Sequence, residues 1–178
     1  MSASSILSRP VSATEPPAAA IEIVASEAER AALAAAYDLV AVNAFAATVR
    51  VEPAGKGVTV EGRVVADIVQ TCVVSLVPVD QHIDETFSVR FTRDAPPPPK
   101  PGTEIVIDTD APDPPEPLDG PTVDVAALAE EYFVLAIDPY PRAPGASIPA
   151  EFAGDPDAAP DSPFAGLADL IRPPNAKG

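Results

Sequence analysis

The sequence has little of what catalysis, metal binding or disulfide formation requires. It has 178 residues, with one cysteine, one histidine and no tryptophan. A single cysteine excludes a disulfide within the chain, and Cys72 and His82 are too few for a structural zinc site, which needs four such ligands. No run approaches the roughly 20 apolar residues of a membrane-spanning helix, and residues 1–17 lack a signal-peptide pattern. We therefore expect a cytoplasmic protein with no metal, cofactor or small-molecule substrate.

Positive charge is also scarce. The formal net charge is -16, and the isoelectric point is about 4.1. Such a surface repels nucleic-acid phosphate and anionic membranes, and it attracts basic proteins. The charge therefore favours a basic protein partner over direct RNA contact, although it could also serve solubility alone.

Proline divides the chain. Of the 24 prolines, ten lie between Asp94 and Pro121 and nine follow Ile137. Such density excludes central strands and helix interiors. We predict a flexible N-terminal segment over 1–20, a single α+β domain over 21–140 with proline-rich linkers at 94–103 and 110–121, and a largely disordered acidic tail over 141–178. Within the linkers and tail, Glu104–Ile107 could form a short strand and Phe164–Ile171 could dock as an amphipathic turn or helix.

Apolar and polar residues alternate in the central region. Phe45–Val51, Val58–Ile68 and Ile83–Phe91 each have period two, and Pro53–Gly57 has the chemistry of a hairpin turn. The apolar link Thr71–Val79 could extend the second strand or form a buried corner. The pattern predicts an antiparallel sheet, preceded by a possible short strand at Ile21–Val24.

Two segments are typical of helices that pack on such a sheet. Ser26 and Glu29 have the spacing of a capping box, which predicts a helix over Ser26–Tyr37 with Leu33 and Tyr37 inward. Asp124 is a cap for a second helix that ends near Asp138. In that helix we expect Val125, Leu128, Tyr132 and Leu135 to face the core, and Glu130 and Glu131 to face outward.

The residues that could carry chemistry have plainer interpretations beside them. His82 lies on the polar face of a predicted strand, and Cys72 lies in an apolar run without a nearby cation to lower its pKa. Adjacent carboxylates such as Glu130 and Glu131 do not face each other and make a poor acid–base pair. Arginines 50, 63 and 90 share the polar sheet face, where they could bind RNA phosphate or an acidic partner. We favour the simpler interpretation, in which they pair across the strands with Glu52, Glu61 and Asp67.

The order of several short motifs resembles the YceD family, also called the large ribosomal RNA subunit accumulation protein family. The motifs are Gly62–Val64, Gln70–Val79, Phe87–Phe91, Thr122–Val125 through Leu128, Glu130–Glu131, Leu135–Ile137 and Ser162–Leu170. The resemblance covers about Arg9 to Leu170. It implies bacterial or plastid origin and a role in making or retaining large-subunit ribosomal RNA, with no known enzymatic activity. Many members have Cys-x-x-Cys where this chain has Cys72 to Ser75, so the resemblance does not extend a metal or redox role to this chain.

These observations lead to one main hypothesis and two alternatives. The main one is a non-enzymatic factor in large ribosomal subunit biogenesis that binds a basic ribosomal protein or assembly factor. The alternatives are an acidic interaction module outside the ribosome, acting through Asp110–Asp119, and a thiol-dependent enzyme using Cys72. We assign no catalytic or metal-binding residue. The candidate binding residues are Arg50, Arg63, Cys72, Arg90, Asp124, Glu130 and Glu131.

Overall fold

The computed structural model describes residues 5–95 and 114–148 of the chain. The elements, in chain order, are β1 (Pro10–Ser12), β2 (Ile21–Val24), α1 (Glu27–Ala36), β3 (Ala41–Ala54), β4 (Gly57–Thr71), β5 (Pro78–Thr92), β6 (Glu116–Pro117), β7 (Thr122–Asp124) and α2 (Val125–Leu135). The chain divides into a unit of residues Met1–Gly145 and a second of Ala146–Gly178, and all of these elements belong to the first. No helix in the described ranges is long and apolar enough to cross a membrane.

Three long strands form the body of the fold, and they confirm the predicted antiparallel sheet. Strands β3, β4 and β5 have 14, 15 and 15 residues, so the longest span ~50 Å. They extend beyond the predicted segments because the residues at their ends still pair in register. In β3 and β4 nearly every second side chain is buried, as period-two patterning predicts, whereas in β5 only Ile83 and Phe87 are buried. The most buried of these are Phe45, Val49, Val58, Val60, Val64, Ala66 and Ile68.

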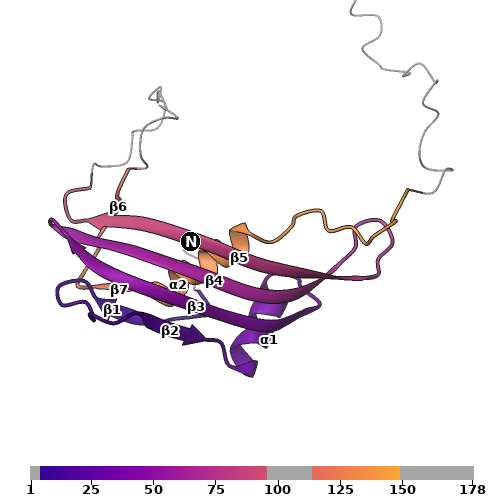
Figure 1. Cartoon of the computed structure of the whole chain (residues 1–178), viewed down its shortest axis with the longest axis horizontal. Helices are drawn as coiled ribbons and strands as arrows, with labels where there is room; N and C mark the ends of the chain where they lie inside the picture. Colours follow the sequence, from indigo (N-terminus) through magenta and orange to yellow (C-terminus); the bar gives the residue numbers. More distant parts are fainter. Residues whose placement is uncertain (1–4, 96–113, 149–178) are drawn as a thin grey trace, which may run out of the picture. The chain divides into compact units, whose positions relative to one another are not determined.

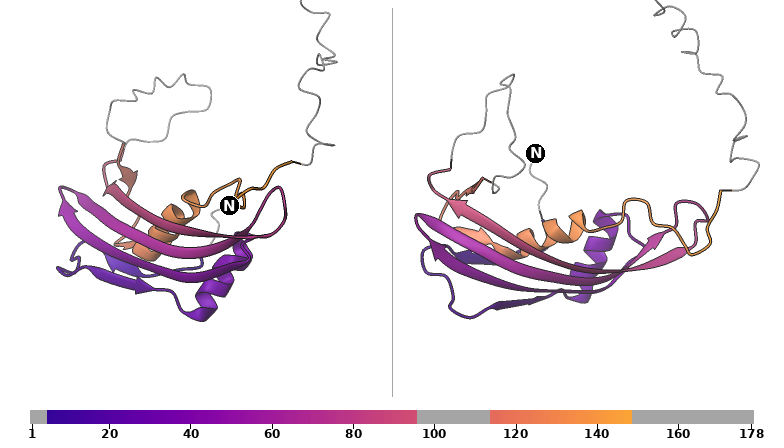
Figure 2. Two further views of the ribbon diagram at one scale, coloured as in Figure 1. Left: turned by 45° about the vertical axis from the view of Figure 1, so that its right-hand side comes forward. Right: turned by 45° about the horizontal axis from the view of Figure 1, so that its top comes forward.

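The sheet has the strand order β2-β3-β4-β5-β6, and Figure 1 shows the three long strands side by side. All neighbours are antiparallel except β6, which pairs with β5 in parallel. Gly55, with φ of +59°, and Lys56 connect Ala54 to its partner Gly57 in a two-residue turn. The positive φ explains a glycine at this position. The sheet curves, and α2 lies inside the curve (Figure 2).

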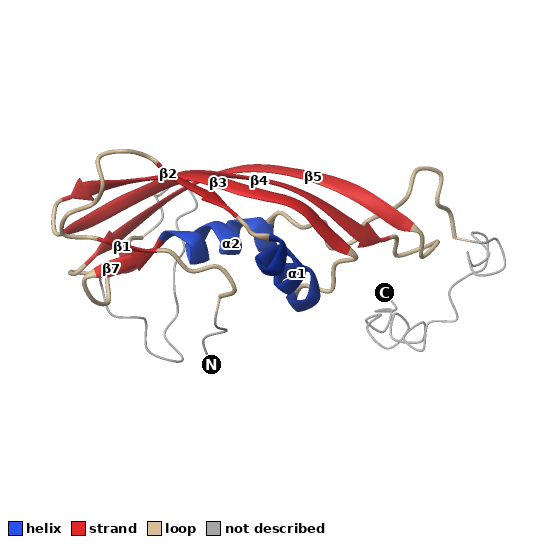
Figure 3. Ribbon diagram, turned by 90° about the horizontal axis from the view of Figure 1, so that it is seen from below, coloured by secondary structure: helices blue, strands red, loops and turns tan. Residues whose placement is uncertain are grey.

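Helix α1 begins as the sequence predicts. The side chain of Ser26 accepts a hydrogen bond from the Glu29 backbone N–H, and the Glu29 carboxylate accepts one from the Ser26 backbone N–H. This reciprocal capping satisfies two donors that the first helical turn leaves unpaired. Leu33 is fully buried, and α1 packs against β3. Both helices cover the same face of the sheet (Figure 3).

Helix α2 begins at the predicted cap but turns a different face inward. The Asp124 side chain accepts hydrogen bonds from the backbone N–H groups of Ala126 and Ala127, which confirms the cap. Glu130, predicted to face outward, is 2% exposed, whereas Leu135, predicted to face inward, is 73% exposed. The helix packs its small residues against the sheet, where the backbones approach closely. The buried residues of α2 are Val125, Ala126, Leu128, Ala129, Glu130 and Phe133.

The N-terminal segment corrects another prediction. Residues 1–20 were expected to be flexible, yet β1 pairs with β7 in a two-stranded antiparallel sheet from Pro10↔Asp124 to Ser12↔Thr122. Leu7 is 1% exposed and belongs to the core. The short, proline-containing pattern of this segment does not predict a strand. Its order comes from tertiary contacts with β7 and α2.

The connections also differ in part from the predictions. The link after β4 is a turn, and it is not a buried corner, because Val73, Leu76 and Val77 are 48%, 75% and 45% exposed. Strand β6 lies within the linker that was predicted to be irregular over 110–121. The predicted strand Glu104–Ile107 and segment Phe164–Ile171 lie outside the described residues.

One glycine in β4 is required by an aromatic stack. Gly62 lies opposite Phe87 in the register, and a Cβ atom at Gly62 would lie 2.4 Å from the Phe87 ring. The same ring stacks on Tyr132 of α2, with ring centroids 4.6 Å apart and an interplanar angle of 14°. The missing side chain at Gly62 therefore lets Phe87 connect the sheet to α2.

Replacing this glycine is expected to loosen that connection. Gly62→Ala should lower the free energy of unfolding by ~1–3 kcal/mol, because the added methyl group displaces the Phe87 ring. Urea denaturation measures the loss. In a double-mutant cycle, the effect of Gly62→Ala should shrink in a Phe87→Leu background, which lacks the ring. Equal losses in both backgrounds would contradict the stack as the cause.

Candidate functional site

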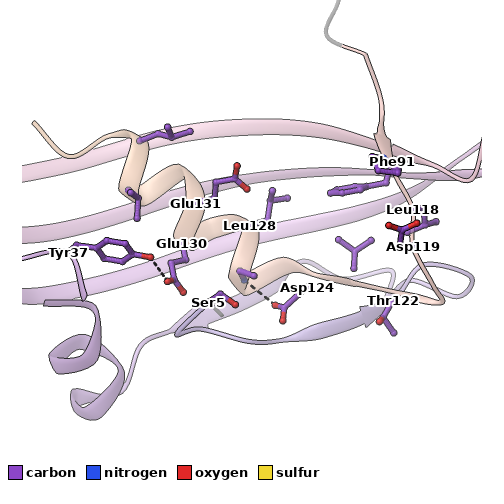
Figure 4. Close-up of a pocket in the computed structure, with 15 residues that line it drawn as sticks. Ser5, Tyr37, Phe91, Leu118, Asp119, Thr122, Asp124, Leu128, Glu130 and Glu131 are labelled. Carbon is purple, nitrogen blue, oxygen red and sulfur yellow. Dashed lines mark hydrogen bonds between the residues drawn. The ribbon is translucent and has the colours of Figure 1, made fainter. Parts of the chain in front are cut away.

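A groove runs along the side of α2 that the sheet leaves uncovered. We call it the α2 groove; its volume is about 660 Å³. Helix α2 contributes positions at helical spacing, so they form one continuous stripe. These residues are the cap Asp124 and, from α2 itself, Ala127, Leu128, Glu131, Val134 and Leu135; Glu130 of α2 also lines the groove. Figure 4 shows Tyr37 and Glu130 at one end of the groove and Phe91 and Leu118 at the other.

The lining of the α2 groove combines apolar surface with negative charge. Four carboxylates belong to it, from Asp119, Asp124, Glu130 and Glu131, and none of the described lining residues is basic. Asp119 and Glu131 are exposed, whereas Glu130 is buried and Asp124 is partly buried. The groove is therefore suited to an apolar surface that carries positive charge at its border.

The Glu130 carboxylate connects three parts of the chain. One oxygen, Oε2, accepts hydrogen bonds from the backbone N–H groups of Ile6 at 2.9 Å and Leu7 at 2.7 Å. The other, Oε1, accepts a hydrogen bond from the Tyr37 hydroxyl at 2.6 Å. Bonds to an ionised group are among the strongest in proteins. Glu130 thus holds the N-terminal segment and the end of α1 against α2.

Asp124 binds the next two residues of the same N-terminal segment, Ser8 and Arg9. Besides capping α2, its carboxylate accepts bonds from the backbone N–H of Arg9 at 2.8 Å and the hydroxyl of Ser8 at 2.6 Å. Partial burial opposes ionisation, but these donors together with the Ala126 and Ala127 N–H groups leave the pKa of Asp124 below its usual value. Asp124 is therefore a structural anion at the wall of the groove.

Tyr37 completes the buried end of the groove. Burial and the hydrogen bond to Glu130 raise the pKa of Tyr37 to about 12, so its hydroxyl remains a donor at physiological pH. Its ring meets Phe133 edge-on at 6.3 Å between centroids, and Phe133 meets Phe45 of β3 at 5.4 Å. The groove end is thus continuous with the core.

The three candidate arginines lie on the opposite, outer face of the sheet. Arg50 is opposite Glu61, and Arg90 is opposite Thr59, so both share a face with Arg63 as the alternation predicts. Arg63 forms a bidentate ion pair with Asp84 of β5. Asp84 was not among the expected partners of Arg63. The two are diagonal neighbours on adjacent strands, and such a pair can be predicted only when the strand register is known. Arg63 therefore already has a carboxylate partner, and Arg50 lies beside one across the strands.

Cys72 lies in the turn between β4 and β5 and is fully buried, as expected. Its sulfur accepts hydrogen bonds from the backbone N–H groups of Ala143 at 3.3 Å, Ser75 at 3.3 Å and Val74 at 3.4 Å. These bonds, that of Ala143 foremost, lower the pKa of Cys72 to about 6. The sequence suggested an inert thiol because no charged neighbour lies close to Cys72 in the sequence. Backbone donors that are brought to the sulfur by folding cannot be recognised from the sequence.

The structure thus separates the predicted binding residues into three places. It brings Asp124, Glu130 and Glu131 together at the α2 groove, puts the arginines on the outer sheet face and leaves Cys72 in the β4–β5 turn. Sequence reasoning missed Tyr37 and Asp119 as groove residues. The sequence around these two residues contains no pattern that predicts a groove. Tyr37 is held at the groove by its hydrogen bond to Glu130, which is distant in the sequence. The described residues contain no group of three His, Cys, Asp or Glu side chains that could hold a metal ion.

Comparison with known proteins adds one finding. A family model described as "Large ribosomal RNA subunit accumulation protein YceD" matches residues 60–171, which is more than half of the chain. The matched region includes the turn with Cys72 and the whole of α2. No curated protein and no solved structure matches the chain.

The bonds of Glu130 lead to a stability prediction with a neighbouring control. Glu130→Gln should lower the free energy of unfolding by about 2–3 kcal/mol, because a neutral amide accepts hydrogen bonds more weakly than a carboxylate. Hydrogen exchange at the amides of Ile6 and Leu7 should accelerate by a larger factor than exchange in β4. Glu131→Gln, at an exposed position, should change stability by less than about 0.5 kcal/mol. Similar losses in the two variants would argue against the proposed role of Glu130.

The lowered pKa of Cys72 predicts a pH-dependent contribution to stability. A thiol in the unfolded chain has a pKa of about 8.5, above the value of about 6 in the folded protein. The contribution is therefore fully present above the unfolded pKa and is lost as the pH falls through the folded one. In urea denaturation, the stability of the wild type relative to Cys72→Ser should rise with pH across this interval. Parallel pH profiles for the two proteins would exclude a stabilised thiolate.

Proposed function

We propose a function on the premise of a finding: the chain belongs to the YceD family. The proposal is that it is a non-enzymatic cytoplasmic factor in large ribosomal subunit biogenesis. In this role it supports the synthesis, processing or accumulation of large-subunit ribosomal RNA. The family match over residues 60–171 is the observation that carries the proposal. The match covers β4 from Val60 onward, β5 and α2, and so includes most of the residues of the α2 groove.

The placement of the possible catalytic groups supports a role without catalysis. His82 lies on the outer sheet face, where its ring nitrogen Nδ1 is 2.7 Å from a carboxylate oxygen of Asp67. Cys72 lies beyond the end of β4, buried and enclosed by backbone donors. A nucleophile needs a base within hydrogen-bond reach and access to substrate. Cys72 forms a thiolate without a base because its pKa is about 6, but its burial denies it access to substrate.

The charge distribution supports a basic protein as the partner, such as a ribosomal protein or another assembly factor. The net charge of -16 repels RNA at long range, and Arg63 already forms an ion pair with Asp84. By contrast, the α2 groove offers apolar surface beside exposed carboxylates. On this view the protein acts on ribosomal RNA indirectly, through the protein that it binds.

A gene deletion tests the proposal. Loss of the protein should lower the ratio of large-subunit to small-subunit ribosomal RNA in the cell, and expression of the wild-type chain should restore it. Quantitative electrophoresis of total RNA measures the ratio. An unchanged ratio would refute the proposal and favour an acidic interaction module outside the ribosome, which would then be sought by deleting residues 110–119.

A further inference from the structure

We propose that the α2 groove is the binding site for a basic amphipathic helix of a partner protein. Apolar side chains of that helix would occupy the groove floor, and its Lys or Arg side chains would meet Asp119 and Glu131. This inference rests on the proposed function, because it names the site and the chemistry of the partner. The experiments below can refute this inference without refuting the ribosomal role.

The shape of the groove fits one face of a helix. Leu128 and Val134 of α2 share the lining with Phe91 of β5 and Leu118, so apolar side chains come from both sides. Helix α2 has 11 residues and is ~16 Å long, which corresponds to about three helical turns. Amphipathic helices commonly bind such grooves through apolar residues spaced three and four positions apart.

Leu135 is an exposed anchor at one end of this surface. Its side chain is 73% exposed, although it lies on the same helical stripe as Leu128 and Glu131. A single exposed leucine is ordinary on a protein surface. Here it adjoins an apolar groove, and covering it would extend the buried area along the full length of α2.

The charge of the groove selects the partner. Glu130 and Asp124 already accept hydrogen bonds from the N-terminal segment, so they contribute a negative potential and leave direct pairing to Asp119 and Glu131. The described lining residues include no cation that would neutralise them. Complementary charge mainly increases the association rate and suppresses wrong partners, while the apolar floor supplies affinity.

The same charge disfavours the chain's own segments as occupants. Residues 149–178 contain five acidic and two basic side chains, and residues 96–113 contain four acidic and one basic. A second copy of the protein carries the same net charge of -16 and would be repelled as a whole. A basic segment of another protein is the occupant that the groove favours.

A labelled model peptide tests the groove directly. The probe is a peptide of about 18 residues made of Leu and Lys, with Leu at helical spacing so that it forms one apolar face. Fluorescence anisotropy against the full chain measures its dissociation constant. A peptide with Glu in place of Lys and another with Ser in place of Leu should both bind far more weakly.

Matched variants separate the groove from the net charge. The double variant Asp119→Asn/Glu131→Gln and the single variant Leu135→Ser should each weaken binding by roughly five- to tenfold. Their controls are Glu27→Gln/Glu52→Gln, which removes two charges elsewhere, and Val24→Ser, at a valine that is 70% exposed. The controls should change binding by less than about twofold. Equal effects in the groove and control variants would overturn the inference, because binding would then follow charge alone.

Complementation of the deletion strain distinguishes this inference from the function on which it rests. The wild-type chain and the control variants should restore the ribosomal RNA ratio, whereas Asp119→Asn/Glu131→Gln/Leu135→Ser should not, provided that it folds to the wild-type melting temperature. Full restoration by the triple variant would refute the groove and keep the ribosomal role. A deletion without any effect on the ratio would refute the ribosomal role, and the peptide measurements would still decide the groove.

Discussion

A single buried carboxylate, that of Glu130, determines how the parts of this domain meet. It accepts bonds from the backbone of Ile6 and Leu7 and from the Tyr37 hydroxyl, so it joins the N-terminal segment, α1 and α2. A buried anion is tolerated only where donors replace the water that it has lost. The position of these donors therefore fixes where the N-terminal segment lies and, with it, one wall of the α2 groove. Asp124 repeats the arrangement at the first turn of the helix.

The sequence predicted the fold well where local rules decide it, and poorly where distant contacts do. Alternation predicted the three long strands, and the capping chemistry of Ser26, Glu29 and Asp124 predicted where both helices begin. The sequence prediction failed for Glu130, because a charged residue is expected in solvent unless its partners are known, and those partners lie 93 to 124 positions away. The order of residues 5–12 was missed for the same reason. Of the candidate site, the acidic residues of α2 were found, but the groove that unites them with Tyr37 and Asp119 was not.

Charge is arranged differently on the two faces of the structure. On the outer face of the sheet, cations and carboxylates lie on neighbouring strands, as in Arg63 with Asp84. Such exposed pairs add little stability, but they lower the residual charge of that face. Beside α2, Glu130 and Asp124 accept hydrogen bonds from backbone N–H groups and from the hydroxyls of Tyr37 and Ser8, and the described groove residues contain no cation. Negative charge and apolar surface thus lie together in the α2 groove.

The pairing of β1 with β7, together with the bonds from residues 6–9 to α2, has a consequence for how the chain is made. These contacts join positions 110–124 residues apart, whereas β3, β4 and β5 pair through short turns. Contacts of such high sequence separation form late, because closing a long loop loses entropy before any contact repays it. During translation the meander can form as soon as it emerges, but the N-terminal segment must wait until α2 has been synthesised. The buried anion and the groove beside it therefore form only after α2 has been synthesised, which leaves the nascent protein unable to bind through this surface before that point.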